Sequence, residues 1–203
     1  MLFQTWLSEE EILRVKKLAQ PLRQRFIVIR GILRKLLSSY SNESPKQIQF
    51  AYTQSGKPIF INLSQIKPIE FNLSHSKNRV AFAFTYHTPI GIDIEYKTQR
   101  EYFDKIAYRF FSADEYEQLN NLPSSEEKLN TFFNYWVRNE ARLKAIGSGL
   151  ETHRSSKYHA NKPSSDFINT NEQCSIHSLT LHPDFAAALA ICGENKTLSI
   201  STL

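Results

Sequence analysis

The sequence predicts an α+β fold made of two halves of about 90–110 residues each. Three observations support this prediction. The chain has 203 residues, which is enough for one ordinary domain or two small fused ones. It is 41% hydrophobic, so it can bury a core. Helical, strand-like, helical and again strand-like segments follow one another along the chain.

The first segments are helical. Ser8 is placed to cap a helix in which Glu11 completes a capping box, and Pro21 ends that helix. A second helix follows, and its broad apolar stripe consists of Phe26, Ile29, Ile32, Leu33, Leu36 and Leu37. Residues 41–45 form a loop.

The middle of the chain is strand-like. Strands are expected at residues 48–52, 71–73, 80–86 and 90–95, with turns at 55–58 and 88–89. Three helices follow, at residues 104–111, 112–122 and 129–146, and Gly147 ends the last one. Residues 151–173 are polar and are expected to form a long loop. Residues 178–181 and 185–192 are expected to close the fold as a strand pair.

Several protein classes are excluded. The apolar run at residues 185–192 is too short to span a membrane, and the N-terminus lacks the basic start of a signal peptide. The two cysteines are too few for a disulfide scaffold, and Cys192 lies in the apolar run, where a buried thiol is expected. A reducing, cytoplasmic location and no membrane partner are therefore predicted.

The positive charge lies at the N-terminal end. Residues 1–57 carry ten basic and four acidic side chains, whereas the whole chain has a net charge of +5. A basic lobe favours an anionic partner such as phosphates, nucleic acid or an acidic protein. A solvated helix face is an equally good explanation, so charge alone does not decide the function.

Two acidic residues form the first chemical signal. Asp93 and Glu95 are two positions apart in a predicted strand, so both carboxylates point to one face and the neighbouring isoleucines point to the core. Two carboxylates on one face suit Mg²⁺, which also takes phosphates and water as ligands. The alternative is an edge strand with a solvated acidic face.

A predicted helix carries the second signal. Trp136, Glu140 and Lys144 fall four residues apart and therefore share one helical face. Glu140 is either a third metal ligand, with Lys144 neutralising a phosphate, or one half of a surface ion pair. A third signal is the stretch Asn72-Leu-Ser74-His75-Ser76 at a strand end, where serine and histidine side chains and exposed backbone N–H groups favour phosphate binding.

The order of these motifs is more specific than any one of them. The series Ser-Gly-Lys-Pro, Phe-Asn-Leu-Ser-His-Ser, Ile-Gly-Ile-Asp-Ile-Glu, Arg-Phe-Phe-Ser and Trp-x-x-x-Glu-Ala-x-x-Lys-Ala-x-Gly-x-Gly-Leu resembles the 4′-phosphopantetheinyl transferases. The resemblance runs from Leu7 to about Gly193. It is closest to the single-chain surfactin-type group and, within it, to the cyanobacterial heterocyst-associated branch.

This resemblance implies a pseudodimer of two similar α+β halves. Residues 1–88 would form the basic, coenzyme A-binding half, and residues 89–203 would hold the metal and dock the partner. The implied reaction moves phosphopantetheine from coenzyme A to a serine of an apo acyl carrier protein or a carrier domain of a polyketide or peptide synthase. Adenosine 3′,5′-bisphosphate is released. Mg²⁺ is the expected ion, with Mn²⁺ as a substitute, and a monomer without nucleic acid is expected.

The resemblance also assigns residues. The metal ligands would be Asp93, Glu95 and Glu140. The coenzyme would be held by Lys144 at the pyrophosphate, by Lys57, Ser74 and His75 at other parts of the phosphates and nucleotide, and by Arg25 with Arg14 at the 3′-phosphate. Glu140, directly or through a metal-bound water, would be the base for the serine hydroxyl. Core packing or a docking ridge for the carrier explains Tyr102, Phe103, Phe110 and Phe111 equally well.

Two departures from the family pattern define the alternative. Asn139 stands where the family usually has a lysine, and Arg138 lies about 100° away on the helix. The chain also begins close to its first helix, so we expect the first half to lack an edge strand that relatives have. The alternative function is therefore a catalytically silent relative that binds coenzyme A or a carrier protein without transfer.

Overall fold

The computed structural model describes residues 2–54, 56–61, 68–99, 102–147, 174–193 and 197–202. Their fold is α+β, as the sequence predicts, and the chain divides into two compact units. The first unit comprises residues 1–71 and 84–87, and the second comprises residues 72–83 and 88–203. The hairpin of β3 (Ile69–Ser76) and β4 (Arg79–Tyr86) contributes residues to both units. The predicted halves, 1–88 and 89–203, stay a prediction.

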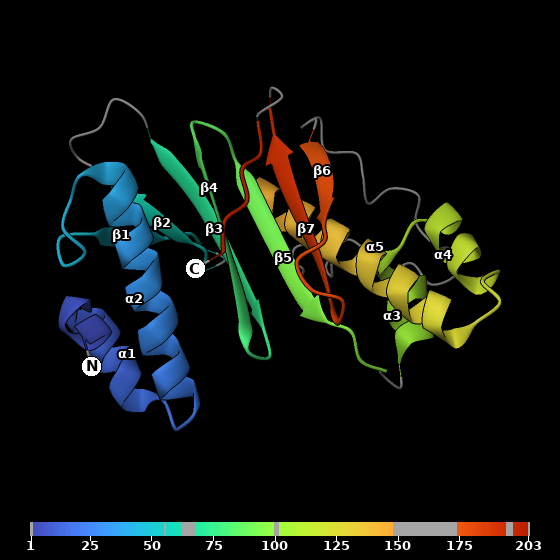
Figure 1. The fold of residues 1–203 in the computed structure, drawn as a ribbon, viewed down its shortest axis with the longest axis horizontal. Helices are drawn as coiled ribbons and strands as arrows, with labels where there is room; N and C mark the ends of the chain where they lie inside the picture. The colour runs from blue at the N-terminus through green and yellow to red at the C-terminus, as the bar shows by residue number, and fades with distance from the viewer. Residues whose placement is uncertain are drawn as a thin grey trace. The chain divides into compact units, whose positions relative to one another are not determined.

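The first unit is mainly helical (Figure 1). Its complete elements are η1 (Leu2–Trp6), α1 (Glu9–Lys17), α2 (Leu22–Ser41), β1 (Gln49–Tyr52) and β2 (Pro58–Ile61). The predicted capping box is confirmed, because the Glu11 backbone N–H donates to the Ser8 hydroxyl and the Ser8 backbone N–H donates to the Glu11 carboxylate. Sequence analysis missed β2, because Pro58 looked like the end of a turn. Residue 55 of that turn lies outside the described residues.

A charged cluster fills part of the first unit's interior. The Glu11 carboxylate accepts two bonds from the Arg34 guanidinium, at 2.7 and 3.0 Å, and lies 3.1 Å from Arg30 Nε. Arg34 is only 1% exposed and also donates to two backbone carbonyls. Both guanidinium groups lie over the Phe50 ring. Part of the N-terminal positive charge is therefore internal and structural.

The second unit is built on an antiparallel sheet with the strand order β5-β7-β6 (Figure 1). Its complete elements are β5 (Ile90–Tyr96), α3 (Phe103–Phe110), α4 (Ala113–Asn120), α5 (Ser125–Ile146), β6 (Cys174–Leu179) and β7 (Phe185–Cys192). Gly147 ends α5 in a left-handed conformation, as predicted. Residues 148–173, which include the predicted loop at 151–173, lie outside the described residues.

The central strand β7 is buried on both faces. Ala186, Ala188 and Ala190 pack against the helices, while Phe185, Leu189 and other residues of opposite parity pack against Ala81 and Ala83 of β4. A strand with two covered faces reads as a continuous apolar run. This explains why residues 185–192 lack the alternation of a half-exposed strand.

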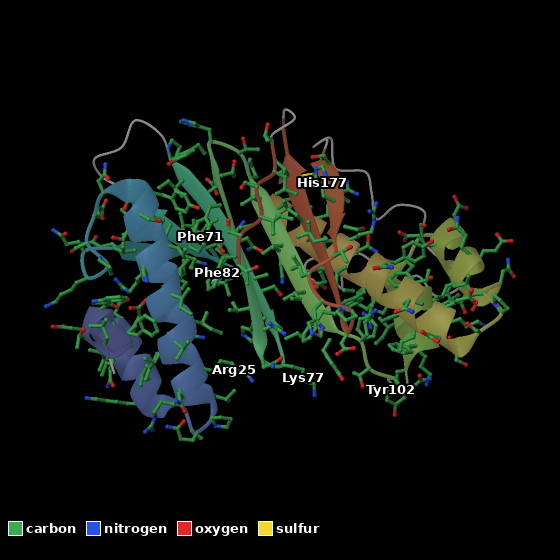
Figure 2. The ribbon with its side chains drawn as sticks, in the orientation of Figure 1. Arg25, Phe71, Lys77, Phe82, Tyr102 and His177 are labelled. Atoms are coloured by element: carbon green, nitrogen blue, oxygen red, sulfur yellow. A yellow bond between two sulfur atoms is a disulfide. The ribbon has the colours of Figure 1, made fainter. Side chains whose placement is uncertain are left out.

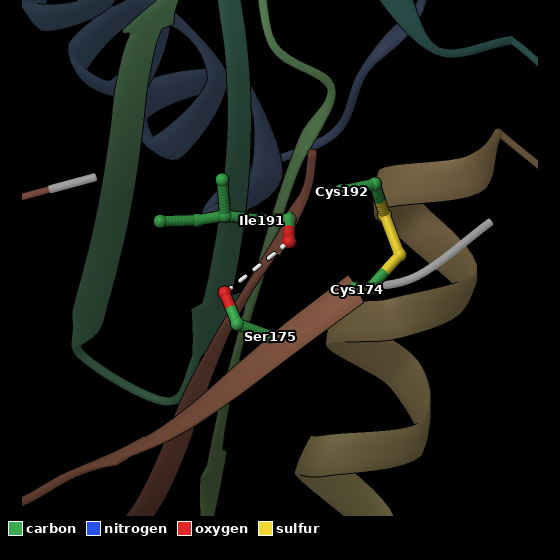
Figure 3. The surroundings of a disulfide bond; sticks show 4 residues. All are labelled: Cys174, Ser175, Ile191 and Cys192. Atoms are coloured by element: carbon green, nitrogen blue, oxygen red, sulfur yellow. Dashed lines mark hydrogen bonds between the residues drawn. A yellow bond between two sulfur atoms is a disulfide. The ribbon is translucent and has the colours of Figure 1, made fainter. Parts of the chain in front are cut away.

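The cysteines correct one prediction. Cys192 is buried, as expected, but it is not a free thiol, because it forms a disulfide with Cys174 (Figure 3). The two residues are direct partners in the β6–β7 register, next to the bond from the Ser175 hydroxyl to the Ile191 carbonyl. Sequence analysis started β6 at residue 178, too late to place Cys174 beside Cys192. The prediction of a reducing compartment thus loses its basis.

None of the helices in the described part of the chain is long and apolar enough to cross a bilayer.

The position of α5 depends on Gly91. A Cβ at this residue would collide with the backbone of α5, at the Ala141 carbonyl oxygen and the Ala145 nitrogen. Ala141 and Ala145 are themselves small and buried, so helix and strand backbones approach closely. Without a side chain at position 91, α5 can lie directly on β5.

We predict that Gly91→Ala lowers the free energy of unfolding by about 3 kcal/mol, because backbone atoms cannot move aside as a flexible side chain can. Urea unfolding followed by circular dichroism measures the change. Lys35→Ala, at an exposed position of α2, is the control and should stay within about 0.5 kcal/mol of the wild type. A Gly91→Ala protein as stable as this control would contradict the close approach.

Candidate active site

Strand β5 carries two carboxylates on the face that α5 covers. Ile90, Ile92 and Ile94 pack in the core on the other face, as the alternation predicts. Asp93 is 3% exposed and Glu95 is half-buried. The alternative of a solvated acidic face is therefore wrong for Asp93. A buried carboxylate needs partners, because desolvation of its charge is costly.

Helix α5 supplies a cation to Asp93. The Lys144 ammonium donates to Asp93 Oδ1 at 2.7 Å and to the Ile92 carbonyl at 3.3 Å. Glu140 lies one turn earlier on the same helix and is half-buried. The close approach at Gly91 thus brings Glu140 and Lys144 of α5 near the acidic residues of β5. Their shared helical face, which the sequence predicts, lets both side chains lie on this side of the helix.

Strand β3 contacts the same stretch of β5 through three polar side chains at alternate positions. Asn72 Oδ1 accepts a bond from the Ile92 backbone N–H at 2.9 Å. The Ser74 hydroxyl donates to Asp93 Oδ1 at 2.7 Å, and the Ser76 hydroxyl donates to Glu95 Oε2 at 2.9 Å. Each β5 carboxylate therefore receives one serine hydroxyl from β3.

Burial dominates the electrostatics of Glu140. The pKa of its carboxyl is raised from the ordinary 4.5 to about 7, and desolvation is the largest cause. The negative charges of Asp93 and Glu95 contribute to this rise, and the Lys144 ammonium opposes part of it. Glu140 therefore shares an electrostatic environment with both acidic residues of β5.

Two buried oxygens at this site have no hydrogen-bond partner among the described residues. They are Asp93 Oδ2 and Glu140 Oε1. No group of three His, Cys, Asp or Glu side chains in the described ranges is arranged to hold a metal ion. Mg²⁺ nevertheless needs only one or two carboxylates when phosphates and water complete its shell. Two buried, unpartnered carboxylate oxygens fit that requirement.

The other predicted site residues are less closely grouped. On β3, His75 is exposed and alternates with the buried Ser74. In the first unit, Arg14 is exposed on α1, and Arg25 is exposed on α2 (Figure 2). Burial lowers the pKa of the Lys57 ammonium, and the Glu70 carboxylate opposes part of that effect. Arg138, which sequence analysis considered as a substitute for a lysine at position 139, donates to the Ser178 hydroxyl on β6.

The first unit also has a pocket of about 520 Å³ at its N-terminal helices. Its lining residues are Gln4, Val15, Lys16, Gln20, Arg23, Gln24 and Ile27. Arg23 Nε is held by the carbonyls of Val15 and Leu18. The lining therefore combines apolar side chains with two cations.

The aromatic residues near α3 divide into two groups. Phe111 is fully buried, and Phe103 and Phe110 pack against the same core. Tyr102, in contrast, is 59% exposed (Figure 2). Core packing therefore accounts for Phe111, and Tyr102 is the member of the predicted ridge that solvent reaches.

Asn72 and Ser76 belong to a motif that the sequence singles out, but they were given no role in the site. Polar residues at positions 72, 74 and 76 alternate with Phe71 and Leu73 along the strand. Alternation shows that they share a face, but it does not show that β5 lies opposite that face.

Comparisons with known proteins agree with the motif pattern. The model of the 4′-phosphopantetheinyl transferase superfamily matches residues 89–192. The chain is 42% identical over 145 residues to the 4′-phosphopantetheinyl transferase HetI of Nostoc sp. PCC 7120, covering 71% of this chain and 61% of that protein. It is 34% identical over 149 residues to the putative 4′-phosphopantetheinyl transferase slr0495 of Synechocystis sp. PCC 6803, covering 73% and 60%. The chain thus spans about three fifths of the length of these relatives.

The raised pKa of Glu140 predicts a pH dependence of stability in protein without added metal. The folded state holds this proton more tightly than the unfolded state, so the contribution is complete below pH 4.5. It is lost as the pH rises through about 7. The loss amounts to about 3 kcal/mol. Urea unfolding of wild type and Glu140→Gln between pH 4.5 and 8 measures it as the difference between the two proteins.

Glu126→Gln is the matched control, because Glu126 is an exposed residue of the same helix. Its difference from the wild type should not change with pH over this range. If the stability of the wild type and that of Glu140→Gln change with pH in the same way, the raised pKa of Glu140 is contradicted.

Proposed function

The chain belongs to the 4′-phosphopantetheinyl transferase superfamily, and we propose that it transfers 4′-phosphopantetheine from coenzyme A to a serine of an apo carrier protein. The serine oxygen forms a bond to the β-phosphorus, and the bond from that phosphorus to the bridging oxygen breaks. Adenosine 3′,5′-bisphosphate leaves with that oxygen. The observation that carries this proposal is the group of the buried Asp93 and the half-buried Glu140 and Lys144, which lies inside the matched residues 89–192.

Asp93 and Glu140 are the proposed ligands of Mg²⁺, and Glu95 is proposed to join them as a third ligand when the ion is bound. The support is the pair of buried, unpartnered oxygens and the electrostatic coupling of Glu140 to both β5 carboxylates. When bound, the ion supplies positive charge that stabilises the negative charge developing on the phosphoryl oxygens. Mn²⁺ has the same preference for oxygen ligands and is expected to substitute.

Lys144 has two partners in this proposal. In the structure its ammonium donates to Asp93 Oδ1. We propose that it would contact the coenzyme's pyrophosphate in the loaded enzyme, where a bound ion would supply the positive charge that Asp93 needs. The long, flexible lysine side chain permits this exchange, because its charge is a point rather than a planar fork.

Glu140 is the proposed base. A serine hydroxyl is a poor nucleophile until its proton is removed. Glu140 Oε1 is assigned to the ion, so the second oxygen of the same carboxylate is the proposed acceptor of that proton.

The remaining assignments concern the coenzyme's phosphates and nucleotide. Ser74 has one hydroxyl proton and gives it to Asp93, so its support as a phosphate donor is weaker than that of the exposed His75. Arg25 and Arg14 are proposed at the 3′-phosphate, because both are exposed cations in the basic N-terminal region. Lys57 is proposed to contact another phosphate or the nucleotide.

The acceptor is proposed to be a carrier protein of fatty-acid, polyketide or nonribosomal-peptide synthesis. Tyr102 is the exposed aromatic residue proposed to contact it. The cytoplasmic location and the monomeric state stay predictions of the sequence.

Intact mass spectrometry tests the function. The full chain is incubated with an apo carrier protein, coenzyme A and Mg²⁺, and we expect the carrier to gain the mass of phosphopantetheine. EDTA should abolish the gain, because the ligands then lack their ion. A folded protein that modifies none of several apo carriers would favour the silent relative instead, and Asn139→Lys would test whether the missing lysine is the cause.

Variants of the acidic site belong to the same assay. Glu140→Gln and Asp93→Asn keep the side-chain shapes, and each should reduce transfer at least about 100-fold. Glu126→Gln on α5 should transfer at the wild-type rate. Wild-type rates in both Glu140→Gln and Asp93→Asn would refute the metal assignment.

Arg25→Ala tests the 3′-phosphate assignment. We expect it to raise the KM for coenzyme A about tenfold or more, because a charge-assisted bond to phosphate is lost. With dephospho-coenzyme A, which lacks the 3′-phosphate, the same variant should match the wild type. Lys35→Ala removes another exposed charge from α2 and is the control. Equal damage with both donors would contradict the assignment.

A further inference from the structure

We propose that Ser76 is a positioning residue for Glu95 and sets the affinity of the acidic site for its divalent cation. This inference rests on the proposed function, because it assumes that Glu95 is a metal ligand. Ser76 ends β3, does not belong to the predicted site, and is half-buried.

The two hydrogen bonds of Ser76 determine the direction of its proton. Ser76 Oγ accepts a bond from the Tyr96 backbone N–H at 3.1 Å. Its only proton therefore goes to Glu95 Oε2, at 2.9 Å. Because the backbone N–H holds the hydroxyl, and the hydroxyl holds the carboxylate, the Glu95 side chain is tied to the strand that carries it.

Ser76 works within a row of three side chains. Asn72 ties β3 to the Ile92 backbone N–H, and Ser74 ties β3 to Asp93. The row fixes the distance between the serine hydroxyls and the carboxylates at both acidic positions of β5. In each carboxylate the serine holds one oxygen, Oδ1 of Asp93 and Oε2 of Glu95.

A held carboxylate binds a cation more tightly than a mobile one. A glutamate side chain has several rotatable bonds, and a metal that orders it must overcome the lost side-chain entropy. A hydrogen bond from a neighbouring residue removes part of that cost before binding. Ser76 therefore acts on metal affinity through Glu95, without contacting the metal.

Binding of Mn²⁺ alone to the full chain tests this role, with the electron paramagnetic resonance signal of free Mn²⁺ as the readout. We expect Ser76→Ala to raise the Kd about tenfold. Ser76→Thr keeps the hydroxyl and should stay within about twofold of the wild type. Ser175→Ala is the matched control, because Ser175 is also a half-buried strand serine whose hydroxyl bonds across strands. Its Kd should not change.

A double-mutant cycle separates positioning from strand pairing. If Ser76 acts through Glu95, then Ser76→Ala should add less than about twofold to the Kd in a Glu95→Gln background. A merely structural tie between β3 and β5 predicts a lower Tm for Ser76→Ala with an unchanged Kd, or equal effects in both backgrounds. Either result would overturn the proposal.

The outcomes also separate this inference from the proposed function. A wild type that does not bind Mn²⁺, or that binds it as well as Glu140→Gln does, refutes the metal site and the role of Ser76 with it. A wild type that binds Mn²⁺ and loses affinity in Glu140→Gln, but not in Ser76→Ala, refutes only the role of Ser76. If Ser76→Ala does not fold, Ser76→Val replaces it and is compared with Ser76→Thr, since valine has the shape of threonine without the hydroxyl.

Discussion

The direct contact between the backbones of α5 and β5 at Gly91 is the constraint on which the second unit depends. Any side chain at this position would collide with the Ala141 carbonyl. The contact covers the acidic face of β5 and brings Lys144 within 2.7 Å of Asp93. The same contact buries Glu140 and raises the pKa of its carboxyl to about 7. Packing and electrostatics at the candidate site therefore have a single structural cause.

The candidate site holds more negative charge than its own side chains neutralise. Lys144 and Ser74 share one oxygen of Asp93, and the other oxygen has no partner among the described residues. Glu140 Oε1 is also buried and has no hydrogen-bond partner among the described residues. Unpartnered polar atoms in a folded interior are costly, so a site that keeps them is suited to a ligand that supplies positive charge. On β5, the Ser74 and Ser76 hydroxyls of β3 hold one oxygen each of Asp93 and Glu95.

The arginines of the first unit fall into two groups, one buried and one exposed. Arg30 and Arg34 face inward and are held by Glu11, whereas Arg14 and Arg25 are exposed. Sequence analysis treated them together, because charge and helical spacing do not show which face the core covers. The cysteines make the same point, since Cys174 and Cys192 are 18 residues apart in sequence and become neighbours only through the register of β6 and β7.

The sequence alone determined the α+β class, most helices and strands, the capping box at Ser8 and the set of candidate acidic residues. These features depend on local periodicity, capping and motif order, which neighbouring residues carry. The tertiary structure decided that Asp93 is buried, that Lys144 pairs with it, and that Asn72 and Ser76 belong to the site. These contacts join residues 19 to 51 positions apart. Only the packing of α5 and β3 against β5 determines which side chains meet there.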